Sequence, residues 1–183
     1  MEQEKHATGI PVHLLTGESR VGKSTLIKRI VGQVGSEHCG GFYTEEVLED
    51  GRRTGFRLVT LGGKTGLLAH ERIGGPVRHG RYGVNLVCLE KIGVPAITEA
   101  VAQKQLVIID ELGPIEASSS AFRHAVLAAL DSLVPVMGTI ALKPHPWLDH
   151  IKQHARVKTS VLTGENREAM SRDFLRFAQG ALS

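Results

Sequence analysis

The chain has 183 residues, 42% of them hydrophobic and 22% charged, which suits one water-soluble globular domain and excludes a fibrous or disordered chain. We expect a cytoplasmic protein without membrane contact, because no apolar run approaches the roughly 18 residues of a membrane span and the polar start lacks the apolar stretch of a secretory signal. The net charge of +3 is too small to indicate a nucleic-acid partner.

The first elements along the chain predict a phosphate-binding loop. Residues 1–8 are expected to be a flexible tail and residues 9–183 a single domain. Within it, Val12–Leu15 is predicted to be a strand and Lys23–Val34 a helix with one apolar side. The segment between them, Gly17–Ser24, has the pattern G-x-x-x-x-G-K-S. A strand, this glycine loop and a helix in succession are typical of a P-loop, also called a Walker A motif.

The chemistry of such a loop gives a role to each of its parts. Its backbone N–H groups and the positive end of the following helix bind polyphosphate oxygens. Lys23 reaches the β- and γ-phosphates and acts in catalysis, and the Ser24 hydroxyl is a ligand of Mg²⁺, the predicted cofactor. The predicted nucleotide-binding residues here are Gly17, Glu18, Ser19, Arg20, Val21, Gly22, Lys23, Ser24 and Thr25.

The next segment is predicted to be an antiparallel insertion at about residues 41–70. Strands at Gly41–Leu48 and Thr54–Leu61 flank an Asp-Gly dipeptide, which is a strong hairpin signal. A third short strand is expected at Thr65–His70. Residues 71–83 are rich in glycine and arginine, and they are expected to form a loop.

The rest of the chain alternates helices and strands. Strands are predicted at Leu106–Ile109, Val134–Ile140 and Val157–Leu162. Helices are predicted at Pro95–Gln103, from the N-cap Ser118–Ser120 to Leu130, at Trp147–His154, and from the cap Thr163 to Gln179. This alternation indicates an α/β fold with a mostly parallel sheet and helices on both of its faces. Cys39 and Cys88 have no C-x-x-C partner and are expected to be free thiols.

A candidate metal-binding carboxylate follows the apolar strand Leu106–Ile109. Asp110 and Glu111 stand at its carboxyl end, where ligands bind in an open parallel sheet. We expect this strand to neighbour the strand of the phosphate loop, so that Asp110 and Ser24 hold Mg²⁺ together. Glu111 is the first candidate for the residue that orients or deprotonates the attacking water.

Six further segments stand in order over nearly the whole chain, from about residue 12 to 170. They are Gly41–Val47, Gly51–Phe56, Tyr82–Asn85, Asp110–Gly113, Gly138–Ile140 and Glu165–Arg167. Together they resemble the signature of a small nucleoside-triphosphatase family, which includes the cancer-related nucleoside triphosphatase and its relatives from thermophiles. The resemblance implies a variant of the RecA-like P-loop NTPase fold. It also implies Mg²⁺-dependent hydrolysis of several nucleoside triphosphates with little base preference.

The chain departs from the family pattern at two places. The family loop usually carries proline or glycine where this chain has Glu18-Ser19-Arg20, and these bulkier side chains constrain the turn. The family typically has a lysine at the position of Pro114. If that lysine neutralises charge in the transition state, this protein is slower or uses a cation from elsewhere. Glu116 remains a candidate acid beside the metal, or a surface residue that leads into a helix.

Five other residues are candidates by analogy with related folds. RecA-like ATPases commonly place a water-activating glutamate after the second strand, so Glu45 and Glu46 compete with Glu111 for the catalytic role. Thr139, at the end of a strand, is placed to sense a γ-phosphate. Asn166 and Arg167 follow the last strand, where related folds bring a loop near the base. Each candidate also has a purely structural alternative. Glu45 and Glu46 could be a surface acid pair, Thr139 a β-branched strand residue, and Asn166 and Arg167 a helix cap.

These observations predict a P-loop nucleoside-triphosphatase that converts ATP, GTP and other triphosphates to the diphosphate and phosphate. No motif marks an arginine for the γ-phosphate, so we expect slow turnover. One alternative is a P-loop kinase that transfers the γ-phosphoryl group to a nucleoside or small metabolite, with residues 71–83 as the acceptor lid. The other is a nucleotide-gated binding module. The sequence does not identify a protein partner.

Overall fold

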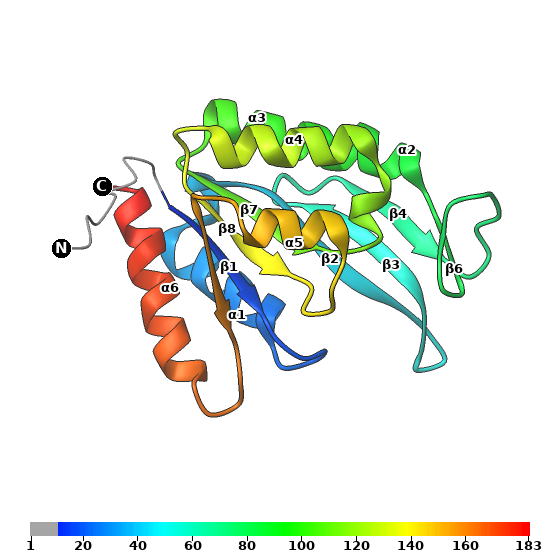
Figure 1. Cartoon of the computed structure of the whole chain (residues 1–183), viewed down its shortest axis with the longest axis horizontal. Helices are drawn as coiled ribbons and strands as arrows, with labels where there is room; N and C mark the ends of the chain where they lie inside the picture. The colour runs from blue at the N-terminus through cyan, green and yellow to red at the C-terminus, as the bar shows by residue number, and fades with distance from the viewer. Residues whose placement is uncertain (1–10) are drawn as a thin grey trace.

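The computed structural model describes residues 11–183, so the tail predicted at residues 1–8 lies outside the described residues. Within them, a nine-stranded sheet has the order β5-β6-β4-β3-β2-β7-β8-β1-β9 (Figure 1). One part of this sheet is parallel and the other antiparallel, and the two parts meet at β2. The predicted α/β architecture is confirmed, although the antiparallel part is larger than expected.

The parallel part of the sheet contains strands that are buried on both faces. Its members, in order, are β2 (Cys39–Glu49), β7 (Leu106–Leu112), β8 (Val136–Ile140), β1 (Val12–Thr16) and β9 (Val157–Val161). In β7, Val107 and Ile109 pack into the core on one face, whereas Leu106 and Ile108 pack on the other. A continuous apolar run is what a parallel strand covered on both faces requires.

Helices cover both faces of the sheet, as predicted (Figure 1). On one face lie α1 (Lys23–Val34) and α6 (Arg167–Ala181), whose buried residues include Ile27, Ile30 and Phe174. On the other face lie α3 (Val94–Gln103), α4 (Ser120–Asp131) and α5 (Pro146–Lys152). The phosphate-loop helix α1 therefore begins at the carboxyl end of β1 and packs under the centre of the sheet.

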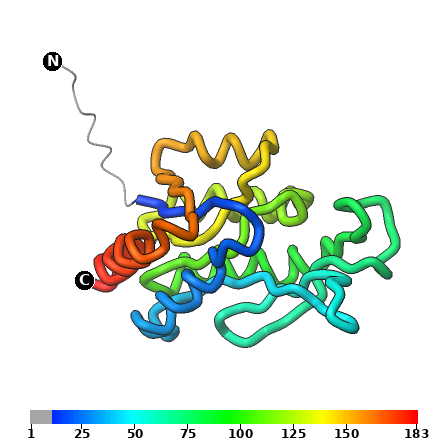
Figure 2. Tube along the Cα trace, turned by 90° about the horizontal axis from the view of Figure 1, so that it is seen from below, coloured from blue at the N-terminus to red at the C-terminus, as the bar shows by residue number. Residues whose placement is uncertain are grey.

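The antiparallel part continues the sheet beyond β2, at the end of the molecule away from α6 (Figure 2). Its strands are β3 (Arg52–Thr60), β4 (Thr65–His70), β6 (Tyr82–Val84) and β5 (Arg78–His79). The hairpin prediction is confirmed, because Asp50 and Gly51 have φ values of 49° and 75°, as a type I′ turn requires.

The prediction of a loop over residues 71–83 is wrong for β5 and β6. Strands of two and three residues are too short to show an alternating pattern in the sequence. They form because β4 offers an unpaired edge, on which Ala69 pairs with Val84 and His70 with Gly83.

The helix ends follow the predicted caps in one case and not in another. Ser119 caps α4 by accepting a 3.1 Å hydrogen bond from the Phe122 N–H. Thr163 does not cap α6, which begins at Arg167, because Thr163 and Asn166 exchange hydrogen bonds within a preceding turn. The residues before α3 are also helical, as α2 (Leu86–Cys88) and a π-helical segment at 89–93, and neither was predicted from the sequence.

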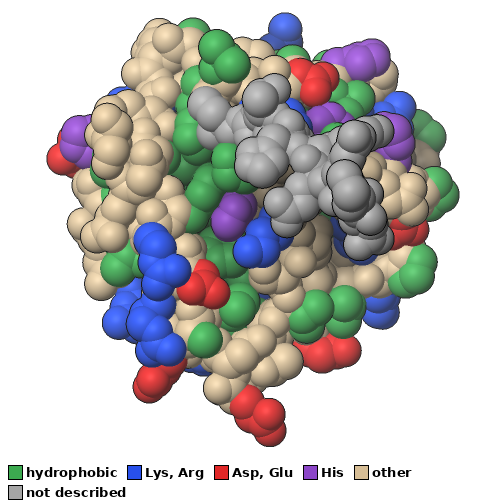
Figure 3. Space-filling model, turned by 60° about the vertical axis from the view of Figure 1, so that its left-hand side comes forward, with side chains coloured by type: hydrophobic (Ala, Val, Ile, Leu, Met, Phe, Trp, Pro, Cys, Tyr) green, Lys and Arg blue, Asp and Glu red, His purple; other side chains and the backbone are tan. Residues whose placement is uncertain are grey.

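On the side drawn in Figure 3, Lys and Arg side chains gather in one group beside acidic ones and are otherwise scattered. Among residues 11–183, no helix is long and apolar enough to cross a bilayer. Cys39 and Cys88 are free and buried, as expected.

Candidate active site

The loop after β1 has the backbone conformation of a tight turn around an open centre. Gly17 and Gly22 have φ values of 146° and 97°, which a residue with a side chain rarely adopts. A Cβ on Gly17 would also lie 2.6 Å from the Leu162 carbonyl oxygen, so two requirements select glycine there. Arg20 has a φ of 63°, a left-handed conformation that disfavours a residue with a side chain. The departure from the family loop pattern at Arg20 therefore falls on a strained position.

The amino end of α1 supplies the donors of the predicted phosphate site. The first intrahelical bond runs from the Leu26 N–H to the Gly22 carbonyl, so the preceding N–H groups have no partner within the helix. Lys23 folds back over the loop, and its Nζ donates to the carbonyls of Gly17 at 2.8 Å and Glu18 at 3.0 Å. The lysine ammonium therefore lies against the loop interior, where an anion would replace the two carbonyls as its partner.

Asp110 lies beneath the loop, although its strand is not the neighbour of β1. The prediction of adjacent strands is wrong, because β8 lies between β1 and β7. Asp110 and Ser24 nevertheless meet, since the Ser24 hydroxyl on α1 donates a 3.0 Å hydrogen bond to Oδ1 of Asp110. Thr139 of the intervening β8 donates to the same oxygen at 2.5 Å. Thr139 thus contacts the carboxylate, in addition to any contact with a phosphate.

The second oxygen of Asp110 is available for a cation. Oδ2 is buried and has no hydrogen-bond partner among residues 11–183. Burial raises the pKa of Asp110, and the hydrogen bonds from Thr139 and Ser24 oppose this rise. A buried carboxylate oxygen without a partner is costly in a protein and fits a divalent cation.

The composition of the site suits a cation that also binds phosphate. Residues 11–183 contain no group of three or more His, Cys, Asp or Glu that could hold a metal alone. Mg²⁺ typically binds through one or two protein oxygens together with phosphate and water, so Ser24 and Asp110 fit that ion.

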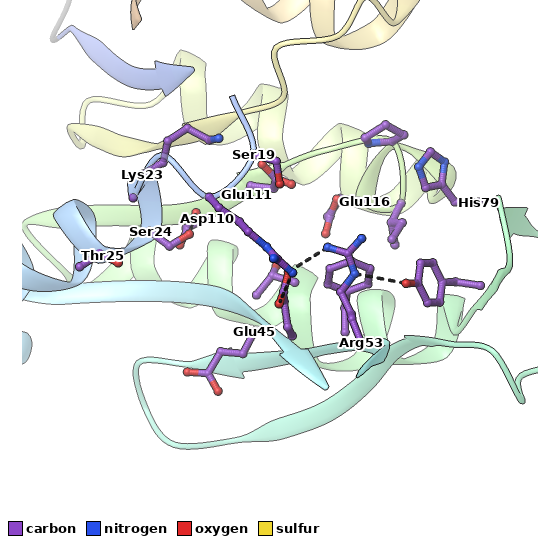
Figure 4. Close-up of a pocket in the computed structure, with 18 of the residues that line it drawn as sticks. Ser19, Lys23, Ser24, Thr25, Glu45, Arg53, His79, Asp110, Glu111 and Glu116 are labelled. Carbon is purple, nitrogen blue, oxygen red and sulfur yellow. Dashed lines mark hydrogen bonds and ion pairs between the residues drawn. The ribbon is translucent and has the colours of Figure 1, made fainter. Parts of the chain in front are cut away.

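These groups open into a cavity of about 690 Å³ between the loop and the antiparallel strands (Figure 4). Beyond Asp110, its acidic residues include Glu111, which is partly buried, and Glu116, which is 3% exposed. Burial and the neighbouring Asp110 raise the pKa of Glu111. Burial and the neighbouring Glu111 raise the pKa of Glu116 to about 8. Three carboxyl groups therefore approach one another at the carboxyl end of β7.

Glu45 and Glu46 lie in β2, beyond the segment of this strand that pairs with β7, and both line the cavity. Glu45 accepts hydrogen bonds from Lys28 at 2.7 Å and from Arg57 at 2.8 Å, and these cations lower its pKa. Glu46 accepts a 2.8 Å hydrogen bond from Arg53. Unlike Glu111, both glutamates are neutralised by ion pairs.

Asn166 and Arg167 lie on the other side of the loop. The Asn166 side chain is occupied in its own turn, since Oδ1 accepts from the Thr163 N–H and Nδ2 donates to the Val161 carbonyl, both at 2.8 Å. Arg167 donates a 2.5 Å hydrogen bond to the Val21 carbonyl and lies over Gly22. Arg167 therefore contacts the phosphate loop, but neither Arg167 nor Asn166 lines the cavity.

The cavity is also lined by residues that were not predicted from the sequence as site residues. They are Lys28, Thr44, Arg53, Phe56, His79, Tyr82 and Ile115. Four of them stood in family-like segments: Thr44 in Gly41–Val47, Arg53 and Phe56 in Gly51–Phe56, and Tyr82 in Tyr82–Asn85. Their common location depends on the order of the antiparallel strands, which the sequence pattern did not give.

Comparison with known proteins agrees with this architecture. A family model described as NTPase matches residues 13–175. The nucleoside-triphosphatase THEP1 of Thermotoga petrophila is 41% identical over 162 residues, which cover 88% of this chain and 89% of that protein. The chain belongs to this nucleoside-triphosphatase family.

Solved structures of the NTPase family share the fold. The crystal structure of THEP1 from Aquifex aeolicus superposes with a TM-score of 0.81 at 35% identity and covers 91% of this chain and 98% of its own. The solution structure of a human cancer-related nucleoside triphosphatase gives a TM-score of 0.78 at 34% identity and covers 93% and 97%. The predicted family, P-loop NTPase fold and enzyme class are thus confirmed.

Proposed function

We propose that this NTPase-family protein hydrolyses nucleoside 5′-triphosphates, ATP and GTP among them, to the diphosphate and inorganic phosphate in a Mg²⁺-dependent reaction. The observation that carries the proposal is the hydrogen bond from Ser24 to Asp110 at the base of a cavity that Lys23 also lines. A triphosphate fits there because donors of the loop and α1 face the buried Asp110 carboxylate, one oxygen of which has no partner within residues 11–183.

Binding of the triphosphate uses the loop and α1. The N–H groups of Gly22–Thr25 donate to phosphate oxygens, and Lys23 exchanges the Gly17 and Glu18 carbonyls for oxygens of the β- and γ-phosphates. Ser24 and Asp110 would hold Mg²⁺, which when bound offsets the negative charge on the β- and γ-phosphates. Val21 and the remaining loop residues supply backbone contacts only.

Glu111 is the residue that positions the attacking water. The water oxygen bonds to the γ-phosphorus while the bond from that phosphorus to the bridging oxygen breaks, and the diphosphate leaves with the bridging oxygen. Glu111 accepts the proton of the water, and its raised pKa brings it closer to the operating pH. Glu45 and Glu46 are less suitable bases, since Lys28, Arg57 and Arg53 occupy their oxygens.

Two features support slow turnover and little base preference. The arginines that face the cavity are already engaged or solvent-exposed, so charge on the γ-phosphate is not offset without rearrangement. The Asn166 amide is consumed by local hydrogen bonds, which leaves no free side-chain amide there to read a base edge.

The proposal is tested by measuring phosphate release from ATP, GTP, CTP and UTP by the wild type, Lys23→Ala and Lys91→Ala. Lys91 is exposed and lies outside the cavity, so its variant is the matched control. We expect slow release of similar rate from all four nucleotides by the wild type and the control, and none from Lys23→Ala. Equal rates in the wild type and Lys23→Ala would refute the proposal.

One observation favours the kinase alternative. His79 and Tyr82, which belong to the predicted acceptor lid, line the cavity. Repeating the assay with nucleosides and small hydroxylated metabolites distinguishes it. A hydrolase releases phosphate at the same rate without acceptors, whereas a kinase consumes ATP only with an acceptor and yields a phosphorylated product. The binding module would be favoured if neither assay released phosphate while the protein bound nucleotide tightly in a Lys23-dependent way.

A further inference from the structure

One cavity cation is held on the side away from the phosphate loop. Arg53, on β3, lines the same cavity as Lys23, Ser24 and Asp110. Figure 4 shows Arg53 across the cavity from Lys23 and Ser24. A triphosphate tail bound to the loop would place its γ-phosphate between the two sides.

The contacts of Arg53 orient its guanidinium group but do not use all of its N–H donors. Nη1 donates to Glu46 at 2.8 Å, Nε donates to the Tyr82 hydroxyl at 3.2 Å, and the guanidinium lies 5.2 Å from the centre of the Phe56 ring. Nη2 has no hydrogen-bond partner among the residues that the structure describes. The side chain is 34% exposed, so it is neither locked in the core nor free in solvent.

The other cations of the cavity are less suited to the outer side of a γ-phosphate. Lys23 belongs to the loop itself. Lys28 is held by Glu45 at 2.7 Å and lies over the Tyr43 ring. The Arg20 side chain is 76% exposed, and its ion pair with Glu46 is long, at 4.0 Å. Pro114, which also lines the cavity, contributes no charge.

We propose that Arg53 is a catalytic residue of the hydrolysis, an arginine supplied from within the chain that leaves Glu46 and binds the γ-phosphate as its bond to the diphosphate breaks. The Glu46 carboxylate is 37% exposed, and ion pairs of this exposure are weak, so a phosphate competes for the guanidinium. Tyr82 and Phe56 keep the arginine on the cavity wall during the exchange. Its planar fork binds two phosphate oxygens, which an ammonium cannot do.

This inference rests on the proposed hydrolysis, and arginine variants separate the two. Arg57 is the matched control, since it lies on the same strand and pairs with Glu45 as Arg53 pairs with Glu46, but it does not line the cavity. The measurements are kcat for phosphate release from Mg-ATP, the Kd of a non-hydrolysable ATP analogue, and the Kd of ADP with aluminium fluoride, which mimics the transferring phosphoryl group.

An arginine on the γ-phosphate contributes about 10³–10⁵ in rate, and we expect Arg53→Ala to lower kcat by at least about 10²-fold. The analogue should bind within about threefold of wild type, whereas ADP with aluminium fluoride should bind much more weakly. Arg53→Lys should resemble Arg53→Ala, although it keeps the charge near Glu46. Guanidinium chloride should restore part of the lost rate in Arg53→Ala. Arg57→Ala should remain near wild type in every measurement.

Several results would overturn the role of Arg53 while leaving the hydrolase intact. They are a wild-type kcat in Arg53→Ala or Arg53→Lys, a loss of analogue binding that accounts for the whole effect, or an equal loss in Arg57→Ala. Circular dichroism checks that each variant is folded, and Arg53→Lys serves as the test if Arg53→Ala is not. Absence of Lys23-dependent phosphate release by the wild type would instead refute the proposed function itself.

Discussion

The Thr139 hydroxyl donates a 2.5 Å hydrogen bond to Oδ1 of Asp110, and both side chains are buried. The two residues come from adjacent parallel strands, β8 and β7. Since Ser24 donates to the same oxygen, Oδ1 has two donors, whereas Oδ2 has no partner in the described part of the chain. The strand between the phosphate loop and Asp110 therefore determines which carboxylate oxygen is available to a cation.

Replacing Thr139 by valine removes this donor and keeps the side-chain shape. We expect the free energy of unfolding to fall by about 1–3 kcal/mol, because a buried acceptor loses its shortest hydrogen bond. The Mg²⁺ concentration for half-maximal phosphate release should rise, since Asp110 is less well oriented. Urea unfolding and Mg²⁺ titration measure the two effects. Thr139→Ser keeps the hydroxyl and should stay near wild type; a Ser variant as impaired as the Val variant would exclude the hydrogen bond as the cause.

Substitution of the three candidate glutamates by glutamine is expected to change the rate of hydrolysis to different extents. Glu111→Gln should lower kcat by about 10²–10⁴-fold and leave nucleotide binding intact, because an amide cannot accept the proton of the water. Glu45→Gln and Glu46→Gln should keep most of the rate, since both carboxylates are occupied by cations. Single-turnover hydrolysis and nucleotide binding, measured on all three variants, separate chemistry from affinity. A larger loss in Glu46→Gln than in Glu111→Gln would assign the role to β2.

The parts of the site that the sequence predicted are the local ones. Gly17 and Ser24 are seven positions apart in one turn, and the run Leu106–Ile109 directly precedes Asp110. In both cases a few neighbouring residues determine the backbone geometry. The meeting of Ser24 and Asp110 also followed, because a parallel sheet collects the carboxyl ends of its strands at one edge.

The parts that the sequence did not predict depend on strand order. The apolar pattern of β8 shows a buried strand but not its position between β1 and β7, so the bond from Thr139 to Asp110 was missed. Arg53 and Tyr82 are 29 positions apart and meet only because β6 pairs with β4. Such pairings are decided by packing of the whole sheet, which no local pattern reports.

Glu116 makes the stability of the protein depend on pH. Its pKa is raised from 4.5 to about 8 in the folded state, chiefly by burial and also by Glu111. The folded protein therefore holds a proton that the unfolded chain releases, so this contribution to stability is complete below about pH 4.5 and is lost as the pH rises through about 8. At about 1.4 kcal/mol per pKa unit, the loss is on the order of 5 kcal/mol.

Glu116→Gln should remove most of this dependence. Urea unfolding without nucleotide at pH 5.5 and 8.5 should show a smaller fall in the variant than in the wild type, and a more stable variant at the higher pH. Glu168→Gln, on the exposed first turn of α6, is the control and should follow the wild type. Parallel pH profiles for the wild type and Glu116→Gln would show that the carboxyl group is not buried as a neutral acid.

Gly138 links the packing of the sheet to the chemistry of the site. It is the residue before Thr139 in β8, and a Cβ there would clash with the carbonyl oxygen of Ile109, the residue before Asp110. Gly138→Ala must therefore push β8 and β7 apart where Thr139 bonds Asp110. We expect a destabilisation of about 3 kcal/mol or more and a weaker dependence of the nucleotide affinity on Mg²⁺. Gly32→Ala, at an open position on the exposed side of α1, should instead stabilise the protein by about 0.5–1 kcal/mol. Thermal unfolding and nucleotide titrations with and without Mg²⁺ measure both variants. If Gly138→Ala were as stable as Gly32→Ala, β7 and β8 would not be packed as closely as the structure has them.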